Sequence, residues 1–466
     1  MLSLYQPDSP ICKDALLLYP FDGLNDVFGY EAYRGCEPYL FTGTRDELLA
    51  ARDTAWLGTF LNGLSPVYDL SGPDAVKLLN RVAVNRDFAK MPVGGSRHAL
   101  LCNEDGYLLS DGVIMRTDEN TFRSYWVAPP LAYYAEKKAP EWGLDVTGKW
   151  VTDEFFIQID GPKSLEIMER AAHQDLHFLK FAKHTNIEVD GVPVRIHRLG
   201  MSGALAYEMH GDMRFVEQVF DAIYQAGKDL GIRKLGYASY TRNHTQGGYP
   251  NQYIHFWYAR LQSGEDQKNF YLSVPFELQG TPFSNDFSRF IGSAADDPVN
   301  ALVTLYDVNW EYLIDWDHDF IGKEALRRLD ANPPRTAVTL VWDREDVGRA
   351  FAAQVYDPEA SPADDISRTG DSVDMPMALS YVEKDGERVG VATGRIIDYY
   401  HHSMISLCWL KRDLAEPGTE VEVIWGTNPA CQTRIKAIVA KMPYYDEKWR
   451  NETCDVEKLV PHPAYE

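Results

Sequence analysis

The stretch Val67-Tyr-Asp-Leu-Ser-Gly-Pro-Asp-Ala-Val-Lys-Leu-Leu79 has a second form, Phe156-Ile-Gln-Ile-Asp-Gly-Pro-Lys-Ser-Leu-Glu-Ile-Met168. In each copy apolar residues alternate up to a Gly-Pro pair and then recur at helical spacing. Proline suits the first turn of a helix, where its missing N–H would have no partner anyway. Each copy therefore predicts a strand, a tight turn and an amphipathic helix, and the repetition predicts two related α+β subdomains.

More strands are expected after each copy. Residues 98–115 read as a hairpin, with its turn at residues 103–106, where Asn, Asp and Gly gather. Residues 195–210 read as another strand–turn–strand unit. Residues 215–230 carry apolar side chains at helical spacing, with an aspartate before them and a glycine after them, and so predict a helix. These elements complete two mixed α+β units.

The remaining chain divides into a loop-like middle and a strand-rich end. Residues 236–297 have weak periodicity and many Gly, Asn, Gln and aromatic residues, so we expect functional loops over a central region. Residues 357–374 are acidic and predict a surface loop. Six strands, and hence an all-β domain, are expected at residues 337–342, 377–382, 388–397, 404–410, 420–425 and 435–439. The expected domains are 1–60 plus 150–300, 61–149 and 301–466.

Composition excludes several classes of protein. The chain has 466 residues and a formal net charge of −23, which disfavours nucleic acid as a partner. The sequence contains no run of about 18 apolar residues, the length that would predict a membrane span. The 6 cysteines are far apart without a Cys-x-x-Cys pair, which indicates free thiols, a cytoplasmic setting and no structural metal. The pair His401-His402 lacks a third ligand at useful spacing.

Several motifs follow one another in order along nearly the whole chain. They are the 67–79 stretch, Leu101-Cys-Asn-Glu-Asp-Gly-Tyr-Leu-Leu-Ser-Asp111, Ile157-Gln-Ile-Asp-Gly-Pro162, Asp319-Phe-Ile-Gly-Lys-Glu-Ala-Leu326, Val389-Gly-Val-Ala-Thr-Gly394 and Pro417-Gly-Thr-Glu-Val-Glu-Val423. Together they resemble the aminomethyltransferase (glycine-cleavage T-protein) family. Four further segments are Asp317-His-Asp-Phe-Ile-Gly322, Val338-Thr-Leu-Val-Trp342, Val423-Ile-Trp-Gly426 and Pro443-Tyr-Tyr445. These look more like one branch of the family, the tetrahydrofolate-dependent aryl O-demethylases of lignin-degrading bacteria, which act on vanillate and syringate.

The resemblance implies a three-lobed α+β protein with tetrahydrofolate in a central channel. It assigns catalysis or folate contact to Asp111, although Ser110 stands where the family has a first Asp. It assigns pterin binding to Glu208 and folate contacts to His98 and Tyr125. An arginine that the family uses on folate falls on Ala238, and Arg242 is the candidate substitute.

The demethylase branch adds the donor site. Its catalytic tyrosine corresponds to Tyr240, and its active-site tryptophan corresponds to Tyr249. Its carboxylate-binding arginine falls on Val127, which argues against a benzoate-type donor or for a different way of binding it. The remaining substrate contacts assigned by the resemblance are Tyr33 (with Tyr30 as the alternative near the N-terminus), Arg242 and His244.

Methyl transfer to a folate nitrogen is an in-line displacement at carbon, so positioning and a proton donor at the leaving oxygen supply the rate. The resemblance implies a tetrahydrofolate-dependent O-demethylase of a small methoxylated aromatic compound, and the residues show no metal-binding motif. An S-methyl or N-methyl donor is one alternative, and a non-catalytic folate-binding protein of the same fold is another. From the residues alone Asp111, Glu208 and Tyr240 also fit a turn residue, a surface residue and a core residue, so their roles depend on the resemblance.

Overall fold

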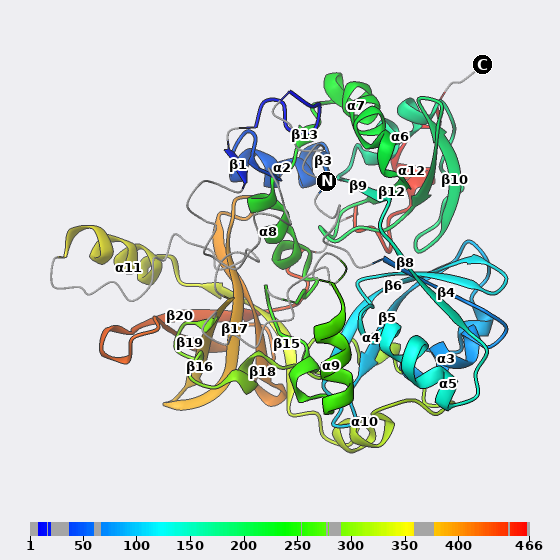
Figure 1. The fold of residues 1–466 in the computed structure, drawn as a ribbon. Helices are drawn as coiled ribbons and strands as arrows, with labels where there is room; N and C mark the ends of the chain where they lie inside the picture. Colours follow the sequence, from blue (N-terminus) through cyan, green and yellow to red (C-terminus); the bar gives the residue numbers. More distant parts are fainter. Residues whose placement is uncertain are drawn as a thin grey trace.

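The computed structural model describes residues 8–15, 17–19, 37–59, 67–252, 254–275, 278, 290–357, 377–445 and 448–463. Tyr33 and Tyr30, expected at the donor site, lie outside these residues. The described chain forms three large sheets placed around helix α8 (Tyr237–Gly247), and this arrangement confirms the expected α+β fold (Figure 1). No helix among the described residues is long and apolar enough to cross a membrane.

The first sheet has the strand order β10-β11-β12-β9-β3-β13. Helices α6 (Ser164–Ala172) and α7 (Val216–Gly227) bury one face of it, against Ile157, Tyr207 and Met209. Because side chains alternate along a strand, Gln158 and Glu208 point to the opposite face. The strands are β3 (Trp56–Gly58), β9 (Glu154–Asp160), β10 (His184–Val189), β11 (Val192–His197), β12 (Ala206–Asp212) and β13 (Arg233–Lys234).

The second sheet has the order β5-β6-β7-β4-β8 and contains the predicted hairpin. Helix α3 (Ala75–Val82) packs on one face, and the other face carries His98 and Asp111. The strands are β4 (Val67–Ser71), β5 (Ser96–Cys102), β6 (Leu108–Asp118), β7 (Thr121–Tyr125) and β8 (Thr147–Val151). The short helices α4 (Pro130–Tyr133) and α5 (Ala139–Glu141) follow β7.

The two copies of the repeat form the same unit. In one copy β4 leads through Gly72 to α3, and in the other β9 leads through Gly161 to α6. The two glycines have φ values of +131° and +135°, and a Cβ on either would lie 2.5 Å from a backbone carbonyl oxygen. Only glycine accepts that backbone and that space. The predicted repeat of strand, tight turn and helix is therefore confirmed.

The third sheet confirms all six strands expected near the C-terminus. Pairing of β16 with β19 closes the order β16-β17-β18-β15-β20-β19 into a barrel. The short strand β14 (Phe290–Ile291) pairs in parallel with the start of β16. The strands are β15 (Arg335–Trp342), β16 (Met377–Lys384), β17 (Glu387–Asp398), β18 (Ser403–Lys411), β19 (Glu420–Trp425) and β20 (Thr433–Ala440). The three domain boundaries stay predictions, because strand membership of a sheet does not define them.

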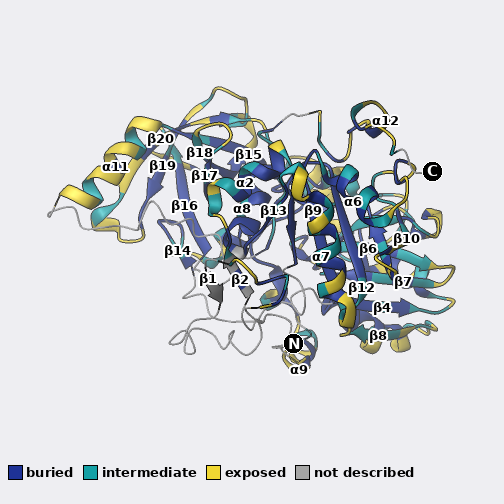
Figure 2. Cartoon of the chain, turned by 90° about the horizontal axis from the view of Figure 1, so that it is seen from above, coloured by how far each residue is buried: buried dark blue, intermediate teal, exposed yellow. Residues whose placement is uncertain are grey.

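Two parts of the chain differ from the expectation. Residues 236–297 were expected to be loops, but they contain α8 and α9 (Glu265–Ser273). Helix α8 is buried on nearly all sides, so its sequence carries no apolar stripe to reveal it. Helix α11 (Arg344–Tyr356) was also missed; it is largely exposed and buries only Ala350 (Figure 2).

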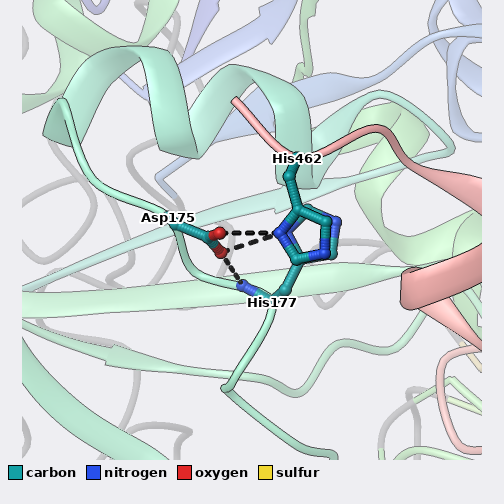
Figure 3. Close-up of side chains that lie close together, drawn as sticks. All are labelled: Asp175, His177 and His462. Atoms are coloured by element: carbon teal, nitrogen blue, oxygen red, sulfur yellow. Dashed lines mark hydrogen bonds and ion pairs between the residues drawn. The ribbon is translucent and has the colours of Figure 1, made fainter. Parts of the chain in front are cut away.

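The C-terminal segment returns to the first sheet at a cluster of histidines and carboxylates. The rings of His177 and His462 stack with centroids 3.9 Å apart, and Asp175 Oδ2 lies 2.7 Å from His462 Nδ1 (Figure 3). His462 Nε2 also lies 3.0 Å from Oε2 of Glu457, which is part of α12 (Val456–Leu459). The buried His177 Nε2 donates to the carbonyl oxygen of Val460. This cluster, the C-terminal clasp, fastens the end of the described chain.

The other helices are α2 (Thr44–Asp53) and α10 (Lys323–Asp330), and strands β1 (Leu17–Tyr19) and β2 (Glu37–Leu40) form a separate pair.

Candidate active site

A cavity of about 890 Å³ lies where the inner faces of the first two sheets meet α8. Seven of the side chains assigned from the sequence line it: His98, Asp111, Tyr125, Glu208, Tyr240, His244 and Tyr249. They come from β5, β6, β7, β12, α8 and the turn after α8, which are far apart in the sequence. The structure therefore brings most of the predicted site residues to one place. Their individual roles stay predictions.

Two assigned residues do not line this cavity in the described part of the chain. Val127 has no exposed surface and belongs to the hydrophobic core beside α3, where its carbonyl oxygen accepts a hydrogen bond from Ser110 Oγ at 3.2 Å. The position before it, Trp126, has a φ of 70° and lines the cavity instead. The guanidinium of Arg242 donates to the carbonyl oxygen of Ala238 one turn earlier in α8. The assignment of both residues as donor contacts stays a prediction.

Asp111 is held by two side chains. His98 Nε2 donates to Asp111 Oδ2 at 2.7 Å, and the Tyr258 hydroxyl donates to Asp111 Oδ1 at 2.6 Å. The same hydroxyl accepts a hydrogen bond from the Asp111 backbone N–H at 3.1 Å. Burial and the Asp111 charge raise the pKa of Tyr258 well above its ordinary value, so this hydroxyl stays protonated. Asp111 is thus fixed in a defined orientation at the cavity wall.

Glu208 faces the cavity from the opposite wall. It lies directly across from Gln158 on β9 and from His197 on β11. His197 Nδ1 lies 3.1 Å from Glu208 Oε2, and His210 Nε2 lies 3.7 Å from the same oxygen. Burial opposes the charge of Glu208, but these two histidines outweigh it and lower its pKa to about 2. Glu208 is therefore a carboxylate over the whole physiological range.

Tyr240 and His244 lie one turn apart on α8. Their rings meet edge to face with centroids 5.5 Å apart. Asn251 Nδ2 lies 3.3 Å from His244 Nε2, and His244 Nδ1 lies 3.3 Å from the carbonyl oxygen of Tyr249. Burial lowers the pKa of His244 to about 4, so the ring is neutral and its Nδ1–H donates to that carbonyl. The His244 ring is thus neutral at neutral pH, and its role in the site stays a prediction.

Comparison with known proteins identifies the family of this chain. The family model described as the GCVT N-terminal domain matches residues 27–251. A sesamin methylene transferase from Sinomonas sp. is 39% identical over 450 residues, which cover 94% of this chain and 96% of that protein.

The chain belongs to the GCVT aminomethyltransferase family.

Other members of this family match most of the chain. A syringate O-demethylase from Sphingobium sp. is 28% identical, with 92% of this chain and 95% of that protein covered. The crystal structure of the glycine-cleavage aminomethyltransferase from Bartonella henselae matches 90% of this chain and 97% of that one, at 16% identity and a TM-score of 0.63. The structural match confirms the fold, and the named relatives confirm the expectation that this aminomethyltransferase-family chain is an enzyme.

Several lining side chains of this family member were missed by the sequence analysis. Gln158 and Trp126 line the cavity, and Tyr258 both lines it and holds Asp111. Gln158 had a visible signal, because it is a polar residue inside the apolar run Phe155–Ile159 of a buried strand. Tyr258 had none, since it lies in the segment with weak periodicity. Residues 312–317, which also line the cavity, were not assigned to the site either.

Proposed function

We propose that this enzyme moves a methyl group from a methoxylated aromatic compound to tetrahydrofolate. The observation that carries the proposal is one cavity with two different walls. One wall presents the fixed carboxylate of Glu208 beside Gln158, and the other presents Asp111 with Tyr240 and Tyr249 nearby. The first wall suits a heterocycle rich in N–H groups, and the second suits an aromatic ether.

The lining residues fit tetrahydrofolate. Glu208 is an ionised acceptor for pterin N–H groups, and Gln158 Nε2 donates to Asp160 Oδ1 at 2.8 Å, which leaves the Gln158 amide oxygen as a neighbouring acceptor. Arg86 is exposed at the cavity and Arg97 lines it, and both suit the carboxylates of a glutamate tail. When bound, tetrahydrofolate supplies the secondary amine that accepts the methyl group.

Two side chains of the protein carry the proton chemistry in this proposal. The carbon–oxygen bond to the methyl group breaks as a carbon–nitrogen bond forms, so one proton leaves nitrogen and one is needed at the leaving oxygen. Asp111, fixed by His98 and Tyr258, accepts the first proton. The Tyr240 hydroxyl donates the second, which stabilises the charge developing on the phenolate. The products are a phenol and methylated folate.

The charges of the lining favour a donor without a carboxylate. Five acidic residues line the cavity, against the two arginines Arg86 and Arg97, and no other arginine or lysine is in the described lining. The acidic residues are Asp111, Glu208, Asp315, Asp317 and Glu452. A carboxylate on the donor would be repelled at close range. With Val127 buried in the core, the expected substrate class is a neutral methoxyarene.

A second candidate reaction is transfer of a methylene group from a methylenedioxy-bridged aromatic compound. It is favoured by the 39% identity with the sesamin methylene transferase over nearly the whole chain. In that case both carbon–oxygen bonds of the bridge break, and the products are a catechol and 5,10-methylene-tetrahydrofolate. We place either reaction in the catabolism of lignin-type aromatics, which the similarity to the syringate O-demethylase supports. We place it in the cytoplasm because 5 cysteines among the described residues are free: Cys12, Cys102, Cys408, Cys431 and Cys454.

A turnover screen with mass-spectrometric detection tests the proposal. Purified protein and tetrahydrofolate are incubated with neutral methoxyarenes, methoxybenzoates, methylenedioxybenzenes, dimethylsulfoniopropionate, sarcosine and dimethylglycine. We expect 5-methyl-tetrahydrofolate from the methoxyarenes, with neutral donors turned over faster than benzoates. Mainly 5,10-methylene-tetrahydrofolate from the methylenedioxy compounds would support the second candidate. Product from the sulfur or nitrogen donors alone, or folate binding without any product, would overturn both.

A further inference from the structure

We infer that His197 and Ser96 form a relay that holds Glu208 in the orientation and ionisation state needed to bind the folate ring. Neither His197 nor Ser96 was assigned a role from the sequence. The inference rests on the proposed function for its ligand and assigns His197 as a positioning residue, since it touches Glu208 and does not line the cavity.

The relay crosses from one sheet to the other. Ser96 Oγ on β5 lies 2.7 Å from His197 Nε2 on β11, and His197 Nδ1 lies 3.1 Å from Glu208 Oε2 on β12. His197 has no exposed surface, so both of its ring nitrogens depend on these two partners. Ser96 is anchored in turn, because its backbone N–H donates to the carbonyl oxygen of Ala182 at 3.0 Å. The two sheets that form the cavity are thus joined through one imidazole ring.

The hydrogen bonds fix the tautomer of the ring. A carboxylate only accepts, so His197 carries its proton on Nδ1 and donates it to Glu208. Nε2 then holds a lone pair, which accepts from the Ser96 hydroxyl at 2.7 Å; the Ala182 carbonyl oxygen, 3.1 Å from the same hydroxyl, is the second acceptor for its one proton. Burial lowers the pKa of His197, which keeps the ring neutral. One oxygen of Glu208 is therefore occupied by a fixed donor, and the other is left for a ligand in the cavity.

One other histidine supports Glu208, but from a greater distance. On its own strand, His210 Nε2 lies 3.7 Å from Glu208 Oε2 and helps His197 to lower the Glu208 pKa, while its ring lies against Tyr125 and Phe156. On β9, the Asp160 carboxyl adds like charge, and burial raises its pKa to about 7. Other titratable groups near the relay are Arg195 on β11, His184 on β10 and Tyr249 after α8. Without His197, the longer His210 contact would remain, and burial would weigh more heavily against the charged form of Glu208.

The test measures the affinity for tetrahydrofolate, under anaerobic conditions and without a methyl donor, between about pH 5.5 and 8.5. The wild-type protein should bind with little change over this range. His197→Leu should bind about 10-fold to 100-fold more weakly, the loss expected for a hydrogen bond to a charged group, and should weaken further as the pH falls. His197→Asn retains a donor near the Nδ1 position and should recover most of the affinity. Ser96→Ala should show a smaller loss.

His184→Leu is the matched control, because His184 is a buried histidine opposite His197 on the neighbouring strand and does not line the cavity. It should bind tetrahydrofolate like the wild type. Wild-type affinity in His197→Leu, or an equal loss at every pH that Asn does not recover, would overturn the relay while leaving the proposed function intact. Absence of binding by the wild-type protein itself would overturn the proposed function and the relay together.

Discussion

At the scale of single residues, Tyr240 is the clearest test of the chemistry. Its side chain lines the cavity at 9% exposure, and its ring meets His244 edge to face. Tyr240→Phe keeps the ring and removes the hydroxyl. We expect kcat with the best donor to fall about 10²-fold to 10⁴-fold, the usual contribution of a positioned proton donor, with KM for tetrahydrofolate nearly unchanged. Steady-state kinetics of the purified variant measure both.

Tyr306→Phe is the matched control for this substitution. Tyr306 is also a buried tyrosine, but its hydroxyl donates to Asp330 Oδ1 at 3.0 Å and it does not line the cavity. Its loss should lower the melting temperature and leave kcat unchanged. Activity of Tyr240→Phe within a few-fold of the wild type would remove Tyr240 from the mechanism.

The residues of the site were predicted unevenly, and the reason is physical. Resemblance gave Asp111 and Glu208, and strand alternation explains why both face inward, opposite the apolar core residues beside them. Alternation ends with β7 at Tyr125, and the left-handed backbone of Trp126 turns the chain. Sequence spacing therefore could not assign Val127 to a face. Pattern analysis could not single out His197, because its contact with Ser96 forms only when β5 of the other sheet lies beside it.

At the scale of elements, the repeated turn makes a prediction for stability. An added Cβ at Gly161 would lie 2.5 Å from the Thr54 carbonyl oxygen, and one at Gly72 would lie 2.5 Å from the Asp145 carbonyl oxygen. Neither backbone oxygen can move freely, and both glycines have positive φ. We expect Gly161→Ala and Gly72→Ala each to lower the free energy of unfolding by about 2–4 kcal/mol, measured by chemical denaturation.

Gly348→Ala gives the opposite expectation and serves as the control. Gly348 lies in the exposed helix α11, and a Cβ there meets no atom within 4 Å. Alanine should stabilise that helix by about 0.5–1 kcal/mol. If all three variants were equally stable, the two turns would not be under the steric constraint described.

The barrel strands were predicted better than the helices that were missed. Each of the six was expected within a few residues of its observed bounds, although most are buried along continuous runs and β20 is the one that clearly alternates. Helix α8 is enclosed by the barrel and the other two sheets, so its polar side chains are buried and no stripe distinguishes its faces. Helix α11 has the reverse problem, because it buries almost nothing. The helix that forms the site was thus the one the pattern concealed.

At the scale of the whole molecule, hydrogen bonds between segments that are distant in the sequence hold the three sheets in their arrangement. The relay joins the first sheet to the second, and α8 joins both to the barrel through hydrogen bonds such as that from Thr245 Oγ1 to the Gly394 carbonyl oxygen at 2.8 Å. The clasp fastens the C-terminal segment to the first sheet. These contacts span most of the chain, so sequence patterns predict the parts of the fold and only the resemblance predicted their assembly.

The clasp makes the assembly sensitive to pH. Hydrogen bonds from His462 to Asp175 and Glu457 raise the pKa of His462 above its ordinary value of about 6.5. A pKa raised in the folded state gives stability that is complete below the unfolded value and is lost as the pH rises through the folded value.

His462→Gln removes this contribution. Hydrogen exchange at residues 456–463, compared between wild type and variant at each pH, should show extra protection in the wild type near about pH 6 that fades by about pH 9. Comparing the two proteins at the same pH cancels the intrinsic pH dependence of exchange. A difference that stayed constant or grew with pH would mean that the ring holds the C-terminal segment by stacking on His177 rather than by its charge.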